Sequence, residues 1–167
     1  MSRFFIGILF LLVFFLACTK AKVGYDPTPY SLKIPSHFPQ MNIPADNPMT
    51  EEGVLLGRML FYEKQLSLDN TISCGSCHAP DAAFSDVNQF SHGVNGAIGV
   101  RNSMALVNLG WQTSFFWDGR AHTLEEQILE PVPNPVEMHL QWKDAVARLK
   151  ANGLYRNHQL NGFHRGF

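Results

Sequence analysis

The stretch Ser73-Cys74-Gly75-Ser76-Cys77-His78 decides how the rest of the sequence is interpreted. Two thiols at this spacing can add to the two vinyl groups of one haem, and the adjacent histidine then lies under the iron as its proximal ligand. Redox dithiols and halves of zinc sites use the same spacing. A zinc site needs a second Cys or His pair, yet the only other cysteine is Cys18, and a redox dithiol needs a strand–helix–strand setting that the sequence lacks. We therefore predict one covalent haem c, attached to Cys74 and Cys77 and ligated by His78.

Length and composition set the class of protein. The chain has 167 residues, which suits one domain of ordinary size and is too short for two full ones. Hydrophobic residues make up 46% and charged residues 16%, so a packed globular core is expected. The formal net charge of -1 gives no basic footprint for nucleic acid.

Residues 1–17 have the pattern of an export signal. Arg3 precedes an apolar run up to Ala17, which is shorter than the about 20 residues of a membrane-spanning helix. Leu16-Ala17-Cys18 resembles a lipobox, so we predict cleavage and lipidation at Cys18; a plain signal or an uncleaved anchor fits the same run. The lipid would hold a periplasmic, cell-envelope protein at a membrane surface. If lipid takes Cys18 and haem takes the other two thiols, none is left free in an oxidising compartment.

Prolines recur between the export signal and Thr50, from Pro27 to Pro48. Because proline breaks helices, we expect residues 18–49 to form a tether and arm without helical structure. Apolar residues between the prolines indicate that the later part of this arm lies on the domain surface; they are Tyr30, Leu32, Ile34, Phe38, Met41 and Ile43.

Helical patterns follow the arm, and no segment alternates convincingly as a strand would. Thr50 can cap a first helix. A short helix is expected over residues 123–129, where Thr123 and Glu126 have capping-box spacing and Pro131 ends the helix. The first helix has an apolar face formed by Leu56, Met59, Leu60 and the stem of Glu63.

Two further helices are expected, a short one over residues 103–109 and a longer one over 136–151. The longer helix would end at Asn152-Gly153. Its apolar stripe consists of Met138, Trp142, Ala145, Val146 and Leu149. The fold predicted from these patterns is all-α, with a Pro-rich N-terminal arm and long loops around a haem.

A series of short motifs runs from Asn47 to Met138. They are Leu56-Gly57-Arg58-Met59-Leu60-Phe61, Leu66-Ser67, the haem motif, Phe84-Ser85-Asp86, His92-Gly93, Arg101-Asn102-Ser103, Phe116-Trp117-Asp118-Gly119-Arg120-Ala121, Leu124-Glu125-Glu126-Gln127 and Pro135-Val136-Glu137-Met138. In order and spacing they resemble the N-terminal, peroxidatic haem domain of the bacterial di-haem cytochrome c peroxidase family. That family includes methylamine-utilisation enzymes, which oxidise a protein substrate. The resemblance implies a cytochrome c-like haem domain over residues 50–155.

The resemblance also implies roles for residues around the haem. His78 would bind the iron on its proximal side, and His92 would be a distal ligand that leaves on activation. Glu137 would be the acid–base residue of the distal side, and Gln127 would add a polar group near that pocket. Without the resemblance, Glu137 reads as a first-turn acid of a helix and His92 as a surface residue in a Gly-rich loop.

Other roles implied by the resemblance concern electron transfer and ion binding. Trp117 would lie between the two haems of the family, and Asn102 would be a ligand of a calcium ion at the domain junction. A core aromatic is the alternative for Trp117. Arg101 and Arg120 would bind the haem propionates or pair with Asp118, and the sequence leaves both partners open.

The sequence departs from the family at its C-terminal end. Members carry a second haem domain with its own Cys-x-x-Cys-His motif, which stores the second electron, whereas this chain has one such motif. Residues 156–167 lose the family's pattern, so we interpret them as an aberrant or truncated C-terminus. A frameshift near residue 156 and a natural mono-haem form both explain this departure.

The predicted function follows from the haem motif and the resemblance together. We expect a peroxidase domain that reduces hydrogen peroxide to water with electrons from a small cytochrome c or copper protein. Two alternatives stay open, a mono-haem c-type electron carrier and an enzyme that oxidises a protein partner. Glu137, His92 and Trp117 favour an enzyme over a carrier.

Overall fold

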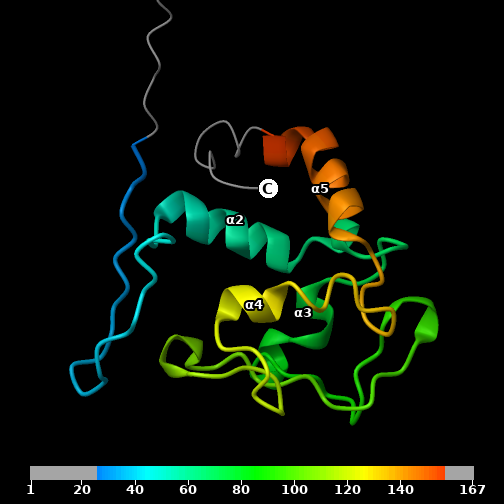
Figure 1. The fold of residues 1–167 in the computed structure, drawn as a ribbon, viewed down its shortest axis with the longest axis horizontal. Coiled ribbons are helices and arrows are strands. Elements are labelled where there is room, and N and C mark those ends of the chain that lie inside the picture. Colours follow the sequence, from blue (N-terminus) through cyan, green and yellow to red (C-terminus); the bar gives the residue numbers. More distant parts are fainter. Residues whose placement is uncertain (1–25, 157–167) are drawn as a thin grey trace, which may run out of the picture.

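The computed structural model describes residues 26–156, so the predicted signal peptide, Cys18 and residues 157–167 lie outside the described residues. Within this range the chain forms short helices joined by irregular segments (Figure 1). The α-helices are α2 (Glu51–Phe61), α3 (Cys74–Cys77), α4 (Leu124–Ile128) and α5 (Trp142–Ala151), and the 3-10 turns are η1 (Lys64–Leu66), η2 (Pro80–Ala82), η3 (Val94–Gly96) and η4 (Leu109–Trp111). Residues 26–156 contain isolated β-bridges and no strand, which confirms the all-α prediction.

Helix α2 begins where its sequence predicted. The Thr50 hydroxyl accepts a hydrogen bond from the backbone N–H of Gly53 at 3.0 Å, and Glu51 and Glu52 occupy the first turn. Acidic side chains there complement the positive end of the helix dipole. The predicted apolar face is partly buried, whereas Leu55 on the other side of the helix is 46% exposed.

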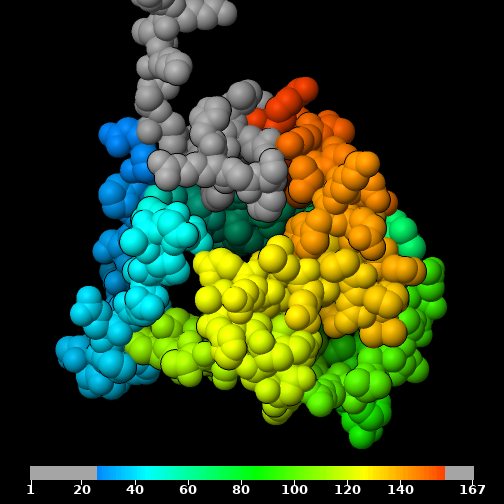
Figure 2. All heavy atoms as spheres, in the orientation of Figure 1, coloured from blue at the N-terminus to red at the C-terminus, as the bar shows by residue number. Residues whose placement is uncertain are grey.

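Helix α4 is also confirmed. The Thr123 hydroxyl accepts a hydrogen bond from the backbone N–H of Glu126 at 3.1 Å. The Glu126 carboxylate accepts a hydrogen bond from the backbone N–H of His122 at 2.8 Å, one residue earlier than a capping box would place it. The helix ends at Ile128, and Figure 2 shows its segment (yellow) meeting that of α5 (orange) on one face.

The prediction of a helix over residues 136–151 is wrong in its first third, because α5 begins only at Trp142. The preceding residues form a tight turn, in which the backbone N–H groups of Glu137 and His139 both donate to the carbonyl oxygen of Asn134. His139 has a left-handed φ of 52°, a conformation that cannot continue a helix. Glu137 therefore lies in a turn and not in the first turn of a helix.

The predicted helix over residues 103–109 does not form either. Its backbone groups bond to other segments of the chain: the carbonyl oxygen of Ser103 accepts from the Ser85 hydroxyl, and the N–H of Leu106 donates to the carbonyl oxygen of Phe84. Asn108 has a left-handed φ of 55°. Tertiary hydrogen bonds outweigh local propensity here, and only the short turn η4 follows.

The described core is small and lies where α5 meets η1. Its buried residues are Leu66, Val132, Met138, Leu140 and Ala145, and Leu60, Ile72, Trp142 and Leu149 pack against them. Arg148 of α5 reinforces this contact because its guanidinium donates to the carbonyl oxygens of Gln65, Ser67 and Leu68 and to Oδ1 of Asn70. In Figure 1, α2 and α5 lie above α3 and α4.

Residues 26–49 contain no helix and run along one side of the molecule (Figure 1). Trp111 of η4 donates its indole N–H to the carbonyl oxygen of Pro39 at 2.9 Å and makes an edge-on contact with Phe38. The Asn47 amide donates to the Glu125 carboxylate on α4. None of the helices in residues 26–156 combines the length and apolar character that crossing a membrane requires.

Candidate functional site

Helix α3 presents the two thiols of the haem motif. The Ser76 hydroxyl accepts a hydrogen bond from the backbone N–H of Ser73, which fixes the start of this single turn. Residues three apart share one face of a helix, so Cys74 and Cys77 lie on the same side. Gly75, between the two cysteines, allows α3 to pack closely against Tyr62. A Cβ at this position would lie 2.6 Å from the Tyr62 ring.

His78 ends α3 and is held in one orientation. Its backbone N–H donates to the carbonyl oxygen of Cys74, and its ring Nδ1 lies 3.0 Å from the carbonyl oxygen of Phe84. A carbonyl only accepts, so Nδ1 is the donor, and in the neutral ring Nε2 keeps the lone pair that a metal needs. Histidine ligands to metals are commonly oriented in this way, and His78 therefore fits the role of a proximal haem ligand.

The ionisation of the two thiols bears on the alternative of a redox dithiol. Burial raises the pKa of Cys74, and burial together with the charges of Asp86 and Glu137 raises the pKa of Cys77 to about 11. Redox dithiols work with lowered pKa values because the thiolate is their nucleophile. The raised pKa values of Cys74 and Cys77 therefore do not favour redox dithiol chemistry.

The His92 loop, residues 91–101, lies beside Cys77. An antiparallel bridge joins His92 to Ile98, and the N–H of Gly99 donates to the carbonyl oxygen of Ser91. Val94, which is 1% exposed, anchors the loop. The Cys77 sulfur lies 3.8 Å from the carbonyl oxygen of His92, while the His92 side chain is exposed. The loop thus brings the predicted distal ligand to the thiol side of α3.

Glu137 faces the same region. The N–H of Val94 donates to its carbonyl oxygen at 2.9 Å, which joins its turn to the His92 loop. Burial raises the pKa of Glu137, and a hydrogen bond from Asn134 and the charge of Arg120 partly offset this effect. The carboxylate in turn acts on both haem-motif thiols, whose pKa values its charge raises. Backbone contacts therefore join the Glu137 turn to the His92 loop, and the same loop reaches Cys77.

Sequence reasoning missed one polar residue in this region. The Asn134 amide donates from Nδ2 to Oε1 of Glu137 at 2.8 Å. The dipeptide Asn134-Pro135 marks a turn, so the backbone geometry could have been anticipated. Nothing in the sequence indicated that the amide would reach the carboxylate three residues later.

Trp117 lies next to Asn102. The indole N–H of Trp117 donates to the carbonyl oxygen of Asn102 at 2.9 Å, and the Trp117 side chain is 63% exposed. That exposure argues against the alternative of a core aromatic. The Asn102 amide donates to the carbonyl oxygens of Asp86 and Asn88, and its Oδ1 accepts from the Ser85 hydroxyl. Among residues 26–156 no group of three or more His, Cys, Asp or Glu is arranged to hold a metal ion.

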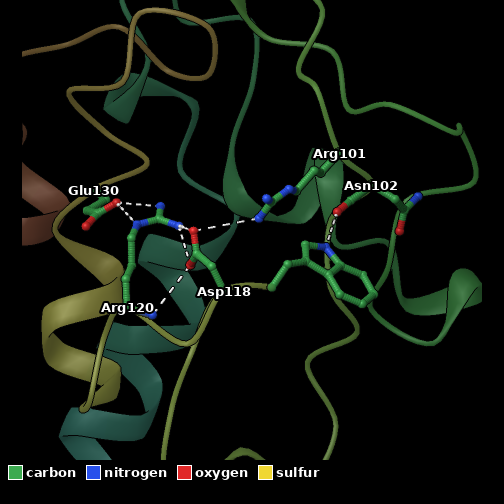
Figure 3. A network of polar contacts seen from close by, with 6 residues as sticks. Arg101, Asn102, Asp118, Arg120 and Glu130 are labelled. Atoms are coloured by element: carbon green, nitrogen blue, oxygen red, sulfur yellow. Dashed lines mark hydrogen bonds and ion pairs between the residues drawn. The ribbon is translucent and has the colours of Figure 1, made fainter.

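The two arginines share one acidic partner (Figure 3). Arg120 pairs with Asp118 at 3.0 Å and with Glu130 at 2.6 Å, and Arg101 approaches Asp118 at 3.7 Å. The Arg120 guanidinium also lies 3.4 Å from the centre of the Phe116 ring. Of the two partners that the sequence left open, the described structure contains the pairing with Asp118. Gln127 is half-buried on α4, one turn after Thr123.

Known proteins match this chain in sequence. The sequence model of the family described as "Di-haem cytochrome c peroxidase" matches residues 51–165. The cytochrome c peroxidase Ccp of Escherichia coli is 37% identical over 130 residues, which cover 77% of this chain and 28% of that protein. The methylamine utilization protein MauG of Methylorubrum extorquens is 40% identical over 114 residues, which cover 65% of this chain and 31% of that protein.

A solved structure agrees with these matches. A MauG-like protein associated with microbial copper homeostasis superposes with a TM-score of 0.71 at 38% identity, over 77% of this chain and 39% of that chain. The chain therefore spans about a third of the length of these relatives. Since the family match covers more than half of the chain and includes the c-type haem motif, the chain belongs to the di-haem cytochrome c peroxidase family.

Proposed function

We propose that residues 50–155 form a peroxidatic domain that reduces hydrogen peroxide to water, with one haem c on Cys74, Cys77 and His78. The observation that carries this proposal is the contact of the half-buried Glu137 with the His92 loop, whose backbone reaches Cys77: the Val94 N–H donates to the Glu137 carbonyl oxygen at 2.9 Å, and the His92 carbonyl oxygen lies 3.8 Å from the Cys77 sulfur. A carboxyl group held in that position is the acid–base group that peroxide cleavage requires.

The overall change consumes one peroxide, two electrons and two protons and yields two water molecules. The haem would supply the site that binds peroxide and the electrons that enter its O–O bond. Glu137 would take the proton from the oxygen nearer the iron and deliver it to the departing oxygen, which then leaves as water. The two protons that the overall change consumes come from solvent and, with the two electrons, convert the remaining oxygen into the second water. Glu137 must be ionised before peroxide binds, so its state of protonation controls the rate.

The surrounding residues have supporting roles in the proposal. His92 would occupy the distal position in the resting state and leave it when its loop moves, which the neighbouring Gly93 and Gly99 would permit. Gln127 would contribute a polar group to the distal pocket. Arg101 and Arg120 would approach the haem propionates, as guanidinium groups bind carboxylates well.

Electron supply and location complete the proposal. Trp117, exposed beside Asn102, would pass electrons from a second haem, and Asn102 would help to bind a calcium ion at that junction. A small cytochrome c or copper protein would be the donor. The domain would work in the periplasm, tethered through lipid on Cys18.

Replacing Glu137 with glutamine tests the proposal. Glutamine has the same shape and can still accept the Asn134 hydrogen bond, but it cannot take up a proton. Haem-loaded Glu137→Gln protein should react with peroxide about 10²-fold more slowly than the parent in single-turnover stopped-flow experiments. Glu125→Gln, on the exposed surface of α4, is the matched control and should react at the parent rate.

Two further measurements belong to the same experiment. Because burial raises the pKa of Glu137 above the ordinary 4.5, the parent rate should already decline on acidification at a pH above that value. The reduced parent should bind carbon monoxide, which a carrier with two strong axial ligands would not do. A Glu137→Gln variant as fast as the parent would refute the acid–base role, and failure to bind carbon monoxide would indicate an electron carrier.

A further inference from the structure

Asn134 contacts both the backbone and the side chain of the Glu137 turn. Its carbonyl oxygen accepts from the N–H groups of Glu137 and His139, at 3.0 and 2.9 Å. Its Oδ1 accepts from the N–H of Val136 at 3.1 Å, and its Nδ2 donates to Oε1 of Glu137 at 2.8 Å. One residue therefore sets the path of the turn and the direction of the carboxylate.

We propose that Asn134 is the positioning residue for Glu137, holding Oε1 so that the other carboxylate oxygen, Oε2, faces the peroxide. This inference rests on the proposed acid–base role of Glu137. It adds the group that fixes the geometry on which proton transfer depends. A glutamate has several rotatable bonds, and proton transfer needs its oxygen within hydrogen-bond reach of the peroxide.

The Glu137 carboxylate meets groups that favour its ionised form and groups that oppose it. The Nδ2 bond is a hydrogen bond to a charged acceptor in a partly buried site, a kind stronger than a neutral one. It favours the ionised form, which opposes the effect of burial on the pKa of Glu137. Arg120 also favours the ionised form, whereas Glu130 and the two haem-motif cysteines oppose it when they are charged. In the haem-loaded protein the two cysteines form thioether bonds and cannot ionise, so they no longer oppose the ionised form of Glu137.

Asn134→Asp separates positioning from a merely structural role. Aspartate keeps an oxygen that can accept from the Val136 N–H, so the turn is preserved. It replaces the Nδ2 donor with a second carboxylate oxygen facing Glu137. Two carboxylates this close cannot both ionise easily, so the pair takes up a proton at higher pH. Asn134→Ser keeps an acceptor for the Val136 N–H and removes the Nδ2 donor without adding charge, so it should behave as the parent if Asn134 only shapes the turn.

Asn152→Asp is the matched control. Asn152 makes the same kind of turn at the end of α5, where its Oδ1 accepts from the N–H of Leu154 at 3.0 Å. If Asn134→Asp fails to fold or to retain haem, Asn134→Ser provides the second variant. Its hydroxyl can still accept from the Val136 N–H but is too short to reach the Glu137 carboxylate.

The experiment measures two properties of haem-loaded protein. The first is the single-turnover rate with peroxide as a function of pH. The second is the infrared C=O band of the protonated Glu137 carboxyl, followed through a pH titration with carbon-13-labelled glutamate and assigned by its loss in Glu137→Gln. In Asn134→Asp the rate at neutral pH should fall by about tenfold or more, and the band should persist to higher pH. Asn152→Asp should match the parent in both properties.

Each outcome decides between the two proposals. If Asn134→Asp reacts and titrates like the parent while Glu137→Gln is slow, the positioning role is refuted and the acid–base role stands. If Glu137→Gln is as fast as the parent, the acid–base role is refuted and the positioning role falls with it. A slow Asn134→Asp with a displaced band supports both roles when the uncharged Asn134→Ser is also slow and Asn152→Asp is normal.

Discussion

Replacing Gly93 with alanine should loosen the contact between the His92 loop and the Glu137 turn. Gly93 has an extended backbone, with φ of -95°, so alanine meets no backbone strain there. Its Cβ, however, would overlap the carbonyl oxygen of Val136 and lie 2.7 Å from that of Glu137. Ordinary contacts begin at 3.4 Å, so the two segments must move apart by roughly 0.7 Å at Glu137 and further at Val136.

The size of the effect follows from what this movement disrupts. Overpacking a tight contact costs about 1–3 kcal/mol, and weakening the hydrogen bond from Val94 to Glu137 adds about 1 kcal/mol. The expected loss in the free energy of unfolding is therefore about 2–4 kcal/mol, or a fall in Tm of roughly 10 °C for a domain of this size. Displacing the acid–base group by close to 1 Å should slow the peroxide reaction by about 10²-fold.

Gly57→Ala is the control for this prediction. Gly57 lies on α2 with no atom within 4 Å of an added Cβ, so alanine should stabilise the helix by about 0.5–1 kcal/mol. Thermal unfolding followed by circular dichroism and stopped-flow mixing with peroxide measure both variants in haem-loaded protein. A Gly93→Ala variant with the parent's Tm and rate would refute the close packing on which the argument depends.

Three other substitutions test separate parts of the molecule. Replacing Cys74 and Cys77 together with alanine should abolish the covalent haem that the parent keeps after acid–acetone extraction; haem retention by the variant would contradict attachment. Arg148→Met should lower the free energy of unfolding, measured by denaturant titration, by about 2 kcal/mol, because the carbonyl oxygens of η1 and the loop after it lose a charged donor. Lys150→Met, at an exposed position of the same helix, should change the free energy of unfolding little. Cys18→Ala should release the mature protein from membranes, and identical fractionation of variant and parent would count against lipidation.

Local signals in the sequence predicted the features that depend on neighbouring residues. The hydroxyls of Thr50 and Thr123 accept from N–H groups three residues later, so the starts of α2 and α4 could be predicted from the local sequence. The haem motif lies within a single turn, so its spacing and the adjacent histidine could be recognised without knowledge of distant contacts. The motif series predicted the family, which the family match confirms.

Features that depend on distant residues could not be predicted in the same way. The helix expected over residues 103–109 gives way to bonds with Ser85 and Phe84, and the start of α5 is delayed by the turn at Asn134. The apolar pattern before Trp142 was wrongly interpreted as helical. Met138 and Leu140 are both buried, as in an extended segment, whereas a helix would place them on different faces.

The same division holds for the candidate site. The sequence by itself predicted which residues would carry its chemistry: the spacing of the haem motif predicted the roles of the two thiols and His78, and the resemblance to the family predicted that of Glu137. Only the tertiary structure decided that the His92 loop lies against the Glu137 turn, that Asn134 holds the carboxylate and that both arginines meet at Asp118. These contacts depend on where the backbone turns, and the turns form only when hydrogen bonds between distant segments outweigh local helical preference.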